Sequence, residues 1–447
     1  MKIFFILFFS TLLLAKSNIT LDQAIKLLKS ENLEIKSARL DIKSSKENTR
    51  SIKGMHWGKL DFIQDFASSD DAGNVFGFKL ASREASFGDF GFSAFDMTNP
   101  NVLNVQPKDL NYPDSRDFFQ SKLKYELPIF TGFKISSYVD IMNSITKMKT
   151  LEKEAVVNEK IYEIKKSFYD MALLHKSEKL LTTILNNINT LENTTQNMID
   201  VGYAKKVDLL EVRAKKGNIE RLISEITSNQ KLLYHYISFL LNQKITKIIT
   251  PSLDVTMPIY SDDDILSSNL DIKQANKGLE IKKSMIDLSL ASYYPTLGAF
   301  GEVSTADDTF FGDANDHSSY TVGARLTWNI LNGGIDSANI QKSRIEHLKT
   351  KNQLQLARTG IALKVQKIRT QIQTYNQDIA SLEKELKLAD EIYKNYEARY
   401  REKLSSMSDV IIKQSAQIQK ILELQLAHNK RNERIFALEK IANGEEK

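Results

Sequence analysis

A long helical repeat is the feature that most constrains how this chain can fold. From Ile361 onward, apolar residues follow one another at spacings of four and three without a break, which is the seam of a coiled coil. Helices over 335–403 and 134–201 would each span on the order of 100 Å. A compact domain of this size does not contain helices of that length, so an elongated structure is expected. The seam comprises Val365, Ile368, Ile372, Tyr375, Ile379, Leu382, Leu386, Ala389, Tyr393, Tyr396 and Tyr400.

The chain also looks like a duplicated unit. The stretch Asn32–Leu60 aligns without a gap with Asn269–Leu297, and the block "YELPIFTGFK" from Tyr125 aligns with "LTWNILNGGI" from Leu326. Such self-similarity indicates architecture better than any single motif. The predicted organisation is a signal peptide over 1–17, a first repeat over 18–243, a linker over 244–260 and a second repeat over 261–447.

Each repeat is predicted to carry two strands and two helices. Between Ser319 and Leu331, apolar residues such as Tyr320, Val322 and Leu326 alternate with polar ones, as expected for a strand with two unlike faces. Strands of this length suit either a tilted membrane-spanning sheet or the sheet of an ordinary soluble core. The predicted strands lie near 57–66, 118–130, 295–305 and 319–331, and the predicted helices are 134–201, 207–243, 335–403 and 408–442.

Four strands cannot close a membrane barrel, because a closed barrel needs about eight or more and lipid tolerates no open edge. Several copies of the chain must therefore share one barrel. The pattern alone leaves open whether two, three or four copies do so.

The amino end predicts export. The stretch "MKIFFILFFSTLLLAKS" has a basic start, a short apolar run and small residues at a plausible cleavage site. This is the pattern of a secretory signal peptide; a membrane anchor is the alternative. The chain has no Cys, so neither disulfides nor a lipid-modified Cys is expected. A net charge of +5 among 61 basic and 56 acidic residues does not suggest a nucleic-acid partner.

Over essentially the whole mature chain these features resemble the TolC family of outer-membrane efflux proteins. The matching motifs are "YYPTLG" from Tyr293, the joints "LPIFTGF" and "WNILNGG", and "VGYAKKVDLL" from Val201. The resemblance implies a mainly α fold with β: three chains form a twelve-stranded barrel in the outer membrane, and long coiled-coil helices form a periplasmic α-barrel. It also implies contact with outer-membrane lipid, a periplasmic adaptor and an inner-membrane pump of the RND or ABC type.

The resemblance places a gate at the periplasmic tip. Asp409 is the expected member of an acidic ring, although a plain helix-start role is an alternative; well-known members have a second Asp where this chain has Ile412. The family's Val-Gly-Leu motif becomes Val-Gly-Tyr here, and a plain C-cap turn is the alternative at this motif. The expected adaptor-contacting residues are Val201, Gly202, Tyr203, Asp208, Ser405 and Ser406.

Four further residues are expected at the joints between strands and helices: Gly132, Pro295, Gly333 and Gly334. Glycine permits a sharp change of backbone direction at such points. The insert Ala67–Asp117 between the first two strands is expected to be an outward loop, either packed across the barrel mouth by its phenylalanines or disordered.

The sequence shows no enzyme. Six His are scattered without metal-ligand spacing, and both a phosphate-binding Gly-Lys-Ser/Thr loop and a Gly-x-Ser-x-Gly motif are missing. No cofactor or metal is expected. The predicted function is a passive exit channel of a tripartite efflux or type I secretion system, exporting small toxic compounds. The alternative is a trimeric coiled-coil structural or adhesive protein of the cell surface.

Overall fold

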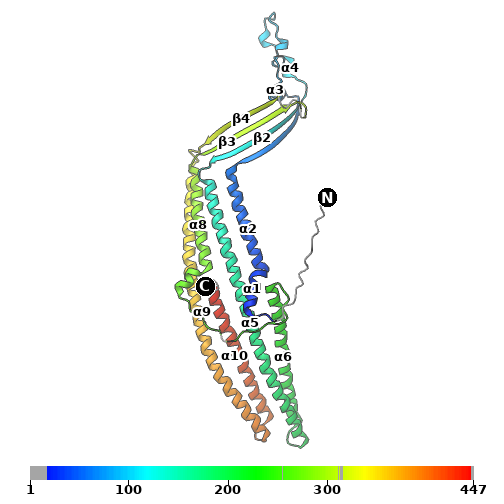
Figure 1. Cartoon of the computed structure of the whole chain (residues 1–447), viewed down its shortest axis with the longest axis vertical. Helices are drawn as coiled ribbons and strands as arrows, with labels where there is room; N and C mark the ends of the chain where they lie inside the picture. The colour runs from blue at the N-terminus through cyan, green and yellow to red at the C-terminus, as the bar shows by residue number, and fades with distance from the viewer. Residues whose placement is uncertain (1–17, 254, 311, 313–315, 444–447) are drawn as a thin grey trace. The chain divides into compact units, whose positions relative to one another are not determined.

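The computed structural model describes residues 18–253, 255–310, 312 and 316–443, so the predicted signal peptide over 1–17 lies outside the described residues. The chain divides into two compact units (Figure 1). One consists of Met1–Lys43, Lys147–Gly278 and Lys351–Lys447, and the other of Ser44–Thr146 and Leu279–Thr350. The expected fold class, mostly helical with four antiparallel strands, is confirmed.

The larger helices and the strands follow the order expected from the duplicated sequence. The fourth strand ends at Thr327 rather than Leu331, where Trp328 Nε1 donates to Tyr293 O at 3.2 Å. The elements are α1 (Leu21–Glu31), α2 (Leu33–Gly54), β1 (Lys59–Ser69), α3 (Ala72–Ala81), α4 (Lys108–Asn111), β2 (Arg116–Phe130), α5 (Lys134–Asp200), α6 (Lys206–Leu241), α7 (Asp262–Ser268), α8 (Leu270–Leu290), β3 (Thr296–Asp307), β4 (Ser318–Thr327), α9 (Ile335–Arg401) and α10 (Met407–Ala442), with short 3₁₀ turns between some of them.

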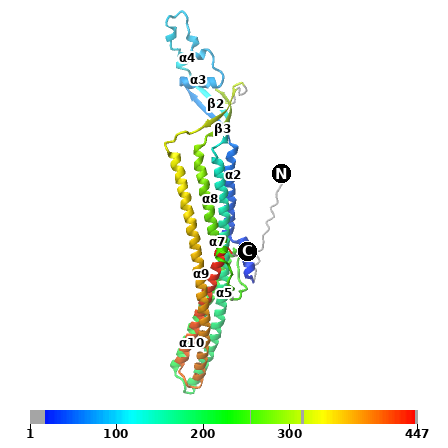
Figure 2. The ribbon, with the colours of Figure 1, turned by 90° about the vertical axis from the view of Figure 1, so that its left-hand side faces the viewer.

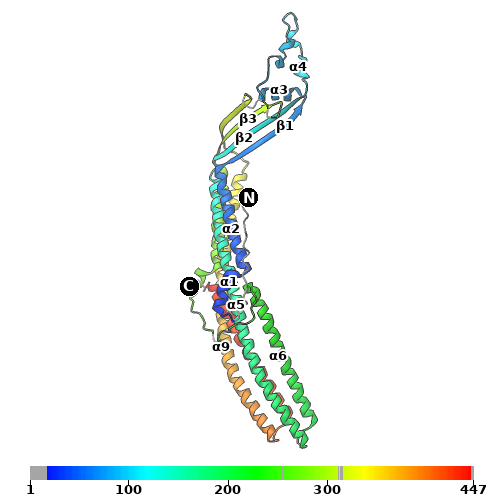
Figure 3. The same cartoon turned by 45° about the vertical axis from the view of Figure 1, so that its right-hand side comes forward.

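The four strands form one antiparallel sheet in the order β1-β2-β3-β4 (Figure 3). Leu60 pairs with Tyr125, Leu123 with Val303, and Val303 with Tyr320, so most of the large apolar residues of the four strands share one face. This apolar sheet face comprises Leu60, Phe62, Phe66, Phe119, Leu123, Tyr125, Leu127, Leu297, Ala299, Val303, Tyr320, Val322, Ala324 and Leu326.

The described residues leave most of the apolar sheet face exposed; Phe310 packs on Phe66 and Phe119 at one end of it. Phe62 is 69% exposed and Tyr320 is 80% exposed, although both are large and apolar. The opposite face is charged: Lys124 pairs with Asp61 in the register, and its ammonium forms an ion pair with Glu126 at 2.6 Å. A sheet with one apolar and one charged face matches a membrane barrel, in which these faces meet lipid and a water-filled lumen. It does not match the sheet of a soluble core.

The insert between β1 and β2 folds back onto the end of the sheet. Phe78 of α3 stacks on Phe118 of β2 with ring centroids 4.2 Å apart, and Val75 of α3 is buried. The insert is therefore a packed element over this part, which corrects the alternative of a wholly disordered loop. Farther along it, Leu103 is 89% exposed.

The unit that consists of Met1–Lys43, Lys147–Gly278 and Lys351–Lys447, called the helical unit below, contains most of two pairs of helices of equal length. Helices α5 and α9 each have 67 residues, and α6 and α10 each have 36. The predicted seam is buried at Val365, Ile368 and Ile372, where α9 packs against Ile435 of α10. The heptad pattern therefore identified the face of α9 that packs. No helix in the described part of the chain is long and apolar enough to cross a membrane.

Matching hydrogen bonds show that the repeat is structural as well as sequential. Asn32 Nδ2 donates to Leu240 O at 2.8 Å, and its Oδ1 accepts the N–H of Ile35 at 3.1 Å. Asn269 makes the same pair of bonds, to Ile441 O at 3.0 Å and from the N–H of Ile272 at 3.1 Å. Each buried Asn ties the start of one helix to the end of another.

The joints between strands and helices use left-handed backbone. Gly132 has φ +62°, and a Cβ there would lie 2.8 Å from Ala291 O and 2.9 Å from Tyr294 Cβ, so only glycine fits this turn. Gly333 and Gly334 have φ of +54° and +82° just before α9 begins. Pro295 lies immediately before β3, where its fixed φ suits the first position of a strand.

Candidate functional site

Two helical turns carry the residues that the sequence singled out for the tip. The α5–α6 turn spans residues 201–205 and the α9–α10 turn spans residues 402–406. In the first turn Gly202 has φ +80°, and the N–H of Tyr203 donates to Met198 O at 2.7 Å. This is a Schellman-type C-cap, for which a left-handed residue is required.

The second turn has the same geometry with a different residue at its left-handed position. Lys403 has φ +63°, and the N–H of Leu404 donates to Arg399 O at 2.7 Å. A left-handed lysine is uncommon, because its Cβ crowds the following carbonyl. Its side chain has a partner that accounts for its presence: Lys403 Nζ lies 3.2 Å from the centroid of the Tyr203 ring.

This cation–π contact joins the two turns, which lie at the same end of the helical unit (Figure 2). Behind it, Thr195 Oγ1 and Tyr400 OH lie 3.3 Å apart, and Tyr400 and Met407 are buried with Val212 in one apolar cluster. The turn that carries Tyr203 thus lies against the turn that carries Ser405 and Ser406, and the role of these residues in an adaptor contact stays a prediction.

Both helices that leave the tip begin with an aspartate that accepts the backbone N–H of the residue three positions before it. At α10 the arrangement is a full capping box with Ser406 as the N-cap: its Oγ accepts the N–H of Asp409 at 3.1 Å, while the Asp409 carboxylate accepts from the Ser406 N–H at 3.2 Å and from its hydroxyl at 2.6 Å. At α6, Asp208 accepts the N–H of Lys205 at 2.8 Å, but the Lys205 ammonium cannot accept a bond in return, so only half of the box is present. These bonds satisfy backbone donors that a helix start leaves open.

Hydrogen bonds from Ser406 lower the pKa of Asp409 below its ordinary value, with a smaller contribution from Lys413 and Arg399. The carboxylate is therefore charged at neutral pH and has two cations beside it. Within one chain Asp409 caps a helix. Its role in an acidic ring remains a prediction.

The tip presents apolar surface to its surroundings. Val201 is 65% exposed and Tyr203 is 64% exposed, one on each side of Gly202. Nothing within 4 Å would meet a Cβ at Gly202, so the turn has open space around it. In the other turn Ser405 is oriented by a bond from its Oγ to Tyr396 O at 3.1 Å.

One buried acid was missed by the sequence reasoning. Asp170 on α5 accepts from Asn429 Nδ2 of α10 at 2.7 Å and lines a groove of about 530 Å³ with Leu232, Leu422 and Leu426. Burial raises the pKa of Asp170 to about 6. The sequence contains a signal for this residue, since "YDMALL" places one carboxylate within an otherwise apolar run. Its hydrogen-bond partner on α10 was not visible in the sequence.

Comparison with protein families matches residues 263–444 to the outer membrane efflux protein family. Comparison with curated proteins gave no match. The matched range is the second predicted repeat almost from end to end, and it contains the α9–α10 turn with Ser406 and Asp409.

Solved structures match the fold of nearly the whole chain. CusC superposes with a TM-score of 0.77 at 13% identity, covering 94% of this chain and 91% of that one. VceC from Vibrio cholerae gives 0.74 at 13% identity, with 95% and 96% covered. CmeC from Campylobacter jejuni, described as an outer membrane channel, gives 0.75 at 13% identity, with 95% and 85% covered. The resemblance drawn from the sequence is confirmed.

Proposed function

We propose that this chain, an outer membrane efflux protein with a TolC-like fold, is the passive exit channel of a tripartite efflux system. Three copies would place twelve strands in the outer membrane, and their helices would extend into the periplasm. In this proposal the protein provides the pore through which substrates leave and does not itself supply energy for their transport.

The exposed apolar sheet face is the observation that carries the proposal. Its large side chains stand on all four strands, while Asp61, Lys124 and Glu302 stand on the other face. Lipid favours the first face, and a water-filled lumen favours the second. Within the described residues β1 and β4 each have one unpaired edge, and an edge in lipid must pair with a further strand. Neighbouring copies supply that strand in the proposed trimer.

The paired turns at the tip are the proposed docking point for a periplasmic adaptor. An adaptor hairpin could cover Val201 and Tyr203, which otherwise remain exposed, and Gly202 leaves room for a close approach. Gate opening would then involve the contact between Lys403 and Tyr203, because it is the direct link between the two turns of one chain. Breaking it would remove one of the contacts that join the two hairpins, beside the buried cluster behind them.

The energy source in this proposal is an inner-membrane pump of the RND or ABC type. The sequence has no phosphate-binding loop of its own. Export of small toxic compounds is favoured over protein secretion, and the pump rather than the channel would select them.

Cross-linking from the tip tests the proposal. The chain has no Cys, so Tyr203→Cys provides a unique attachment point for a photo-crosslinker in intact cells. Mass spectrometry of the captured proteins is expected to find a periplasmic adaptor, and the pump that this adaptor serves would separate drug efflux from protein secretion.

The matched control is Leu103→Cys, which places the same reagent on the exposed insert between β1 and β2. It should capture no adaptor. If Tyr203→Cys trimers are well folded and capture only copies of the chain itself, the exit-channel role fails and the structural or adhesive alternative gains support.

A further inference from the structure

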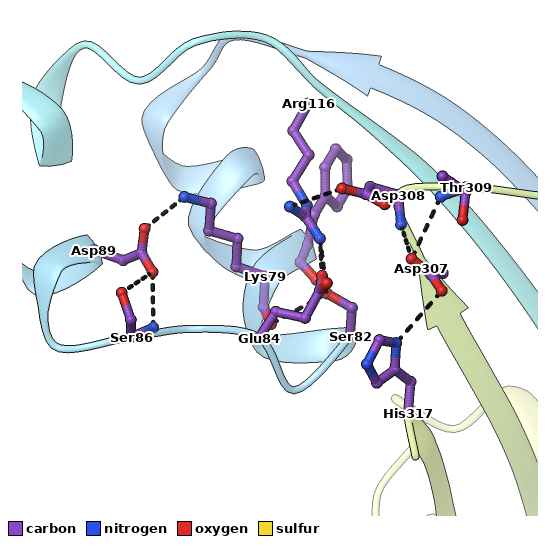
Figure 4. A network of polar contacts seen from close by, with 11 residues as sticks. Lys79, Ser82, Glu84, Ser86, Asp89, Arg116, Asp307, Asp308, Thr309 and His317 are labelled. Carbon is purple, nitrogen blue, oxygen red and sulfur yellow. Dashed lines mark hydrogen bonds and ion pairs between the residues drawn. The ribbon is translucent and has the colours of Figure 1, made fainter. Parts of the chain in front are cut away.

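A cluster of metal-ligating side chains lies at one end of the sheet. Glu84 of the insert, Asp307 at the end of β3 and His317 just before β4 each place one ligand atom within 4.8 Å of the other two (Figure 4). These residues come from three separate segments of the chain. Neither the sequence reasoning nor the proposed function assigned them a role.

The three side chains are held in place by neighbours. Asp307 Oδ1 accepts the N–H of Asp308 at 2.7 Å, which directs Oδ2 toward His317. A Cβ at Gly312 would lie against the Asp307 carboxylate, so a larger residue there would displace this side chain. Glu84 accepts from Ser82 Oγ at 2.7 Å and is paired with Arg116 of β2.

One nitrogen of the imidazole lacks a hydrogen-bond partner. His317 Nδ1 is buried and has no hydrogen bond among the described residues. It lies 3.6 Å from Asp307 Oδ2, which is too long for a hydrogen bond. In tetrahedral zinc sites, with metal–ligand bonds of about 2.0 to 2.2 Å, two ligand atoms lie about 3.4 Å apart. The observed spacing therefore suits a shared metal ion better than a direct contact.

The local charge also favours a cation. Glu84, Asp307 and Asp308 bring three negative charges, and Arg116 brings one positive charge that it shares between Glu84 and Asp308 at 3.3 Å. The nearby Lys79 is engaged with Asp89 at 2.5 Å. With a neutral imidazole the cluster carries an excess of two negative charges, which one divalent ion would balance.

We propose that Glu84, Asp307 and His317 bind a divalent transition metal ion, with zinc as the best-suited ion. Imidazole nitrogen and carboxylate oxygen are both ligand types that zinc takes in proteins, and a water molecule could complete four-coordination beside these three side chains. The nitrogen ligand disfavours magnesium and calcium, which prefer oxygen. The bound ion ties the insert to the β3–β4 turn and so fixes the insert at the end of the sheet.

Calorimetric titration tests the site. The full chain is purified in detergent through a tag without histidine, stripped with a chelator, and titrated with zinc chloride. One zinc ion per chain is the expected stoichiometry. A hundredfold excess of calcium should leave binding in place. His317→Ala and Glu84→Gln should each weaken zinc binding at least about tenfold, the scale seen when metal sites lose a supporting group.

Two variants control for the chemistry of the substitutions. His56→Ala removes an exposed imidazole from the same unit, and Asp89→Asn removes a carboxylate of the same insert that bonds Lys79 and Ser86 instead. Both should bind zinc as the unaltered protein does. As a second readout, zinc should slow proteolysis of the insert in the unaltered protein and not in His317→Ala.

Absence of zinc binding by the folded, unaltered protein would overturn the proposal, and the cluster would then be an ion-pair network centred on Arg116. Equal affinity in His317→Ala would overturn it too. Neither result bears on the tip or on the exit-channel proposal, so the two can fail separately.

Discussion

At the scale of single residues, Asp170 makes the stability of the helical unit depend on pH. Burial raises its pKa to about 6 from an ordinary 3.8, despite Lys166 and the hydrogen bond from Asn429. The folded state therefore binds the proton more tightly than the unfolded state does. The resulting stabilisation is complete below pH 3.8 and is lost as the pH rises through 6.

Asp170→Asn is expected to remove this dependence. The amide oxygen can still accept from Asn429, and the residue no longer ionises, so the variant should be more stable than the parent at pH 8 by up to about 3 kcal/mol. At pH 4 the two should be nearly equal. Urea unfolding followed by circular dichroism at fixed protein concentration measures this.

Asp378→Asn, at an exposed position on α9, is the control and should show the parent's pH profile. If Asp170→Asn keeps that profile as well, the carboxylate is hydrated in the assembled protein and the groove does not bury it.

Residue-level chemistry was only partly predictable from the sequence. The offset between the repeats placed Asp208 opposite Asp409, and both carboxylates accept a backbone N–H at the start of their helices. The same offset places Gly202 opposite Lys403, but nothing in the residue pattern indicates a left-handed lysine. Its contact with Tyr203 depends on how two hairpins pack, and local propensity does not report this.

At the scale of elements, the first turns of α6 and α10 allow two roles of an aspartate to be tested separately: capping a helix and forming the gate. Both helices open with a carboxylate that accepts a backbone N–H, so the two aspartates are structurally equivalent. The resemblance assigns the gate to Asp409 alone. Asparagine preserves the acceptor oxygen while it removes the charge, which makes it a better probe than alanine.

Asp409→Asn is expected to lower the preference of the channel for cations over anions severalfold, because three carboxylates at a constriction attract cations. Asp208→Asn is the matched control and should leave the preference unchanged. Reversal potentials in a salt gradient across a planar bilayer measure both. Unchanged selectivity in Asp409→Asn would mean that this carboxylate acts only as a cap, consistent with its bonds to Ser406.

The long helices were the most predictable elements because their seam repeats over many turns, and Val365, Ile368 and Ile372 are buried as that seam requires. Element ends were less predictable. Strand β4 stops at Thr327 although alternation continues beyond it, because its partner β3 begins at Thr296, the residue opposite Thr327. The insert folds back through Phe78 onto Phe118 of β2; its phenylalanines suggested packing, but not this partner.

At the scale of the whole molecule, one chain is an incomplete structure. A four-stranded sheet leaves large apolar side chains such as Phe62 and Tyr320 exposed and two edges open within the described residues. Lipid and further copies satisfy both requirements at once. The sequence already indicated shared closure from the number of strands, whereas the choice of three copies came from the family resemblance.

The most direct test of the central claim is single-channel recording from the purified protein in a planar bilayer. A passive channel predicts discrete, stable current steps with a preference for cations and no requirement for nucleotide. If intact, well-folded oligomers insert into the bilayer and pass no current, the account of this chain as an exit channel is contradicted.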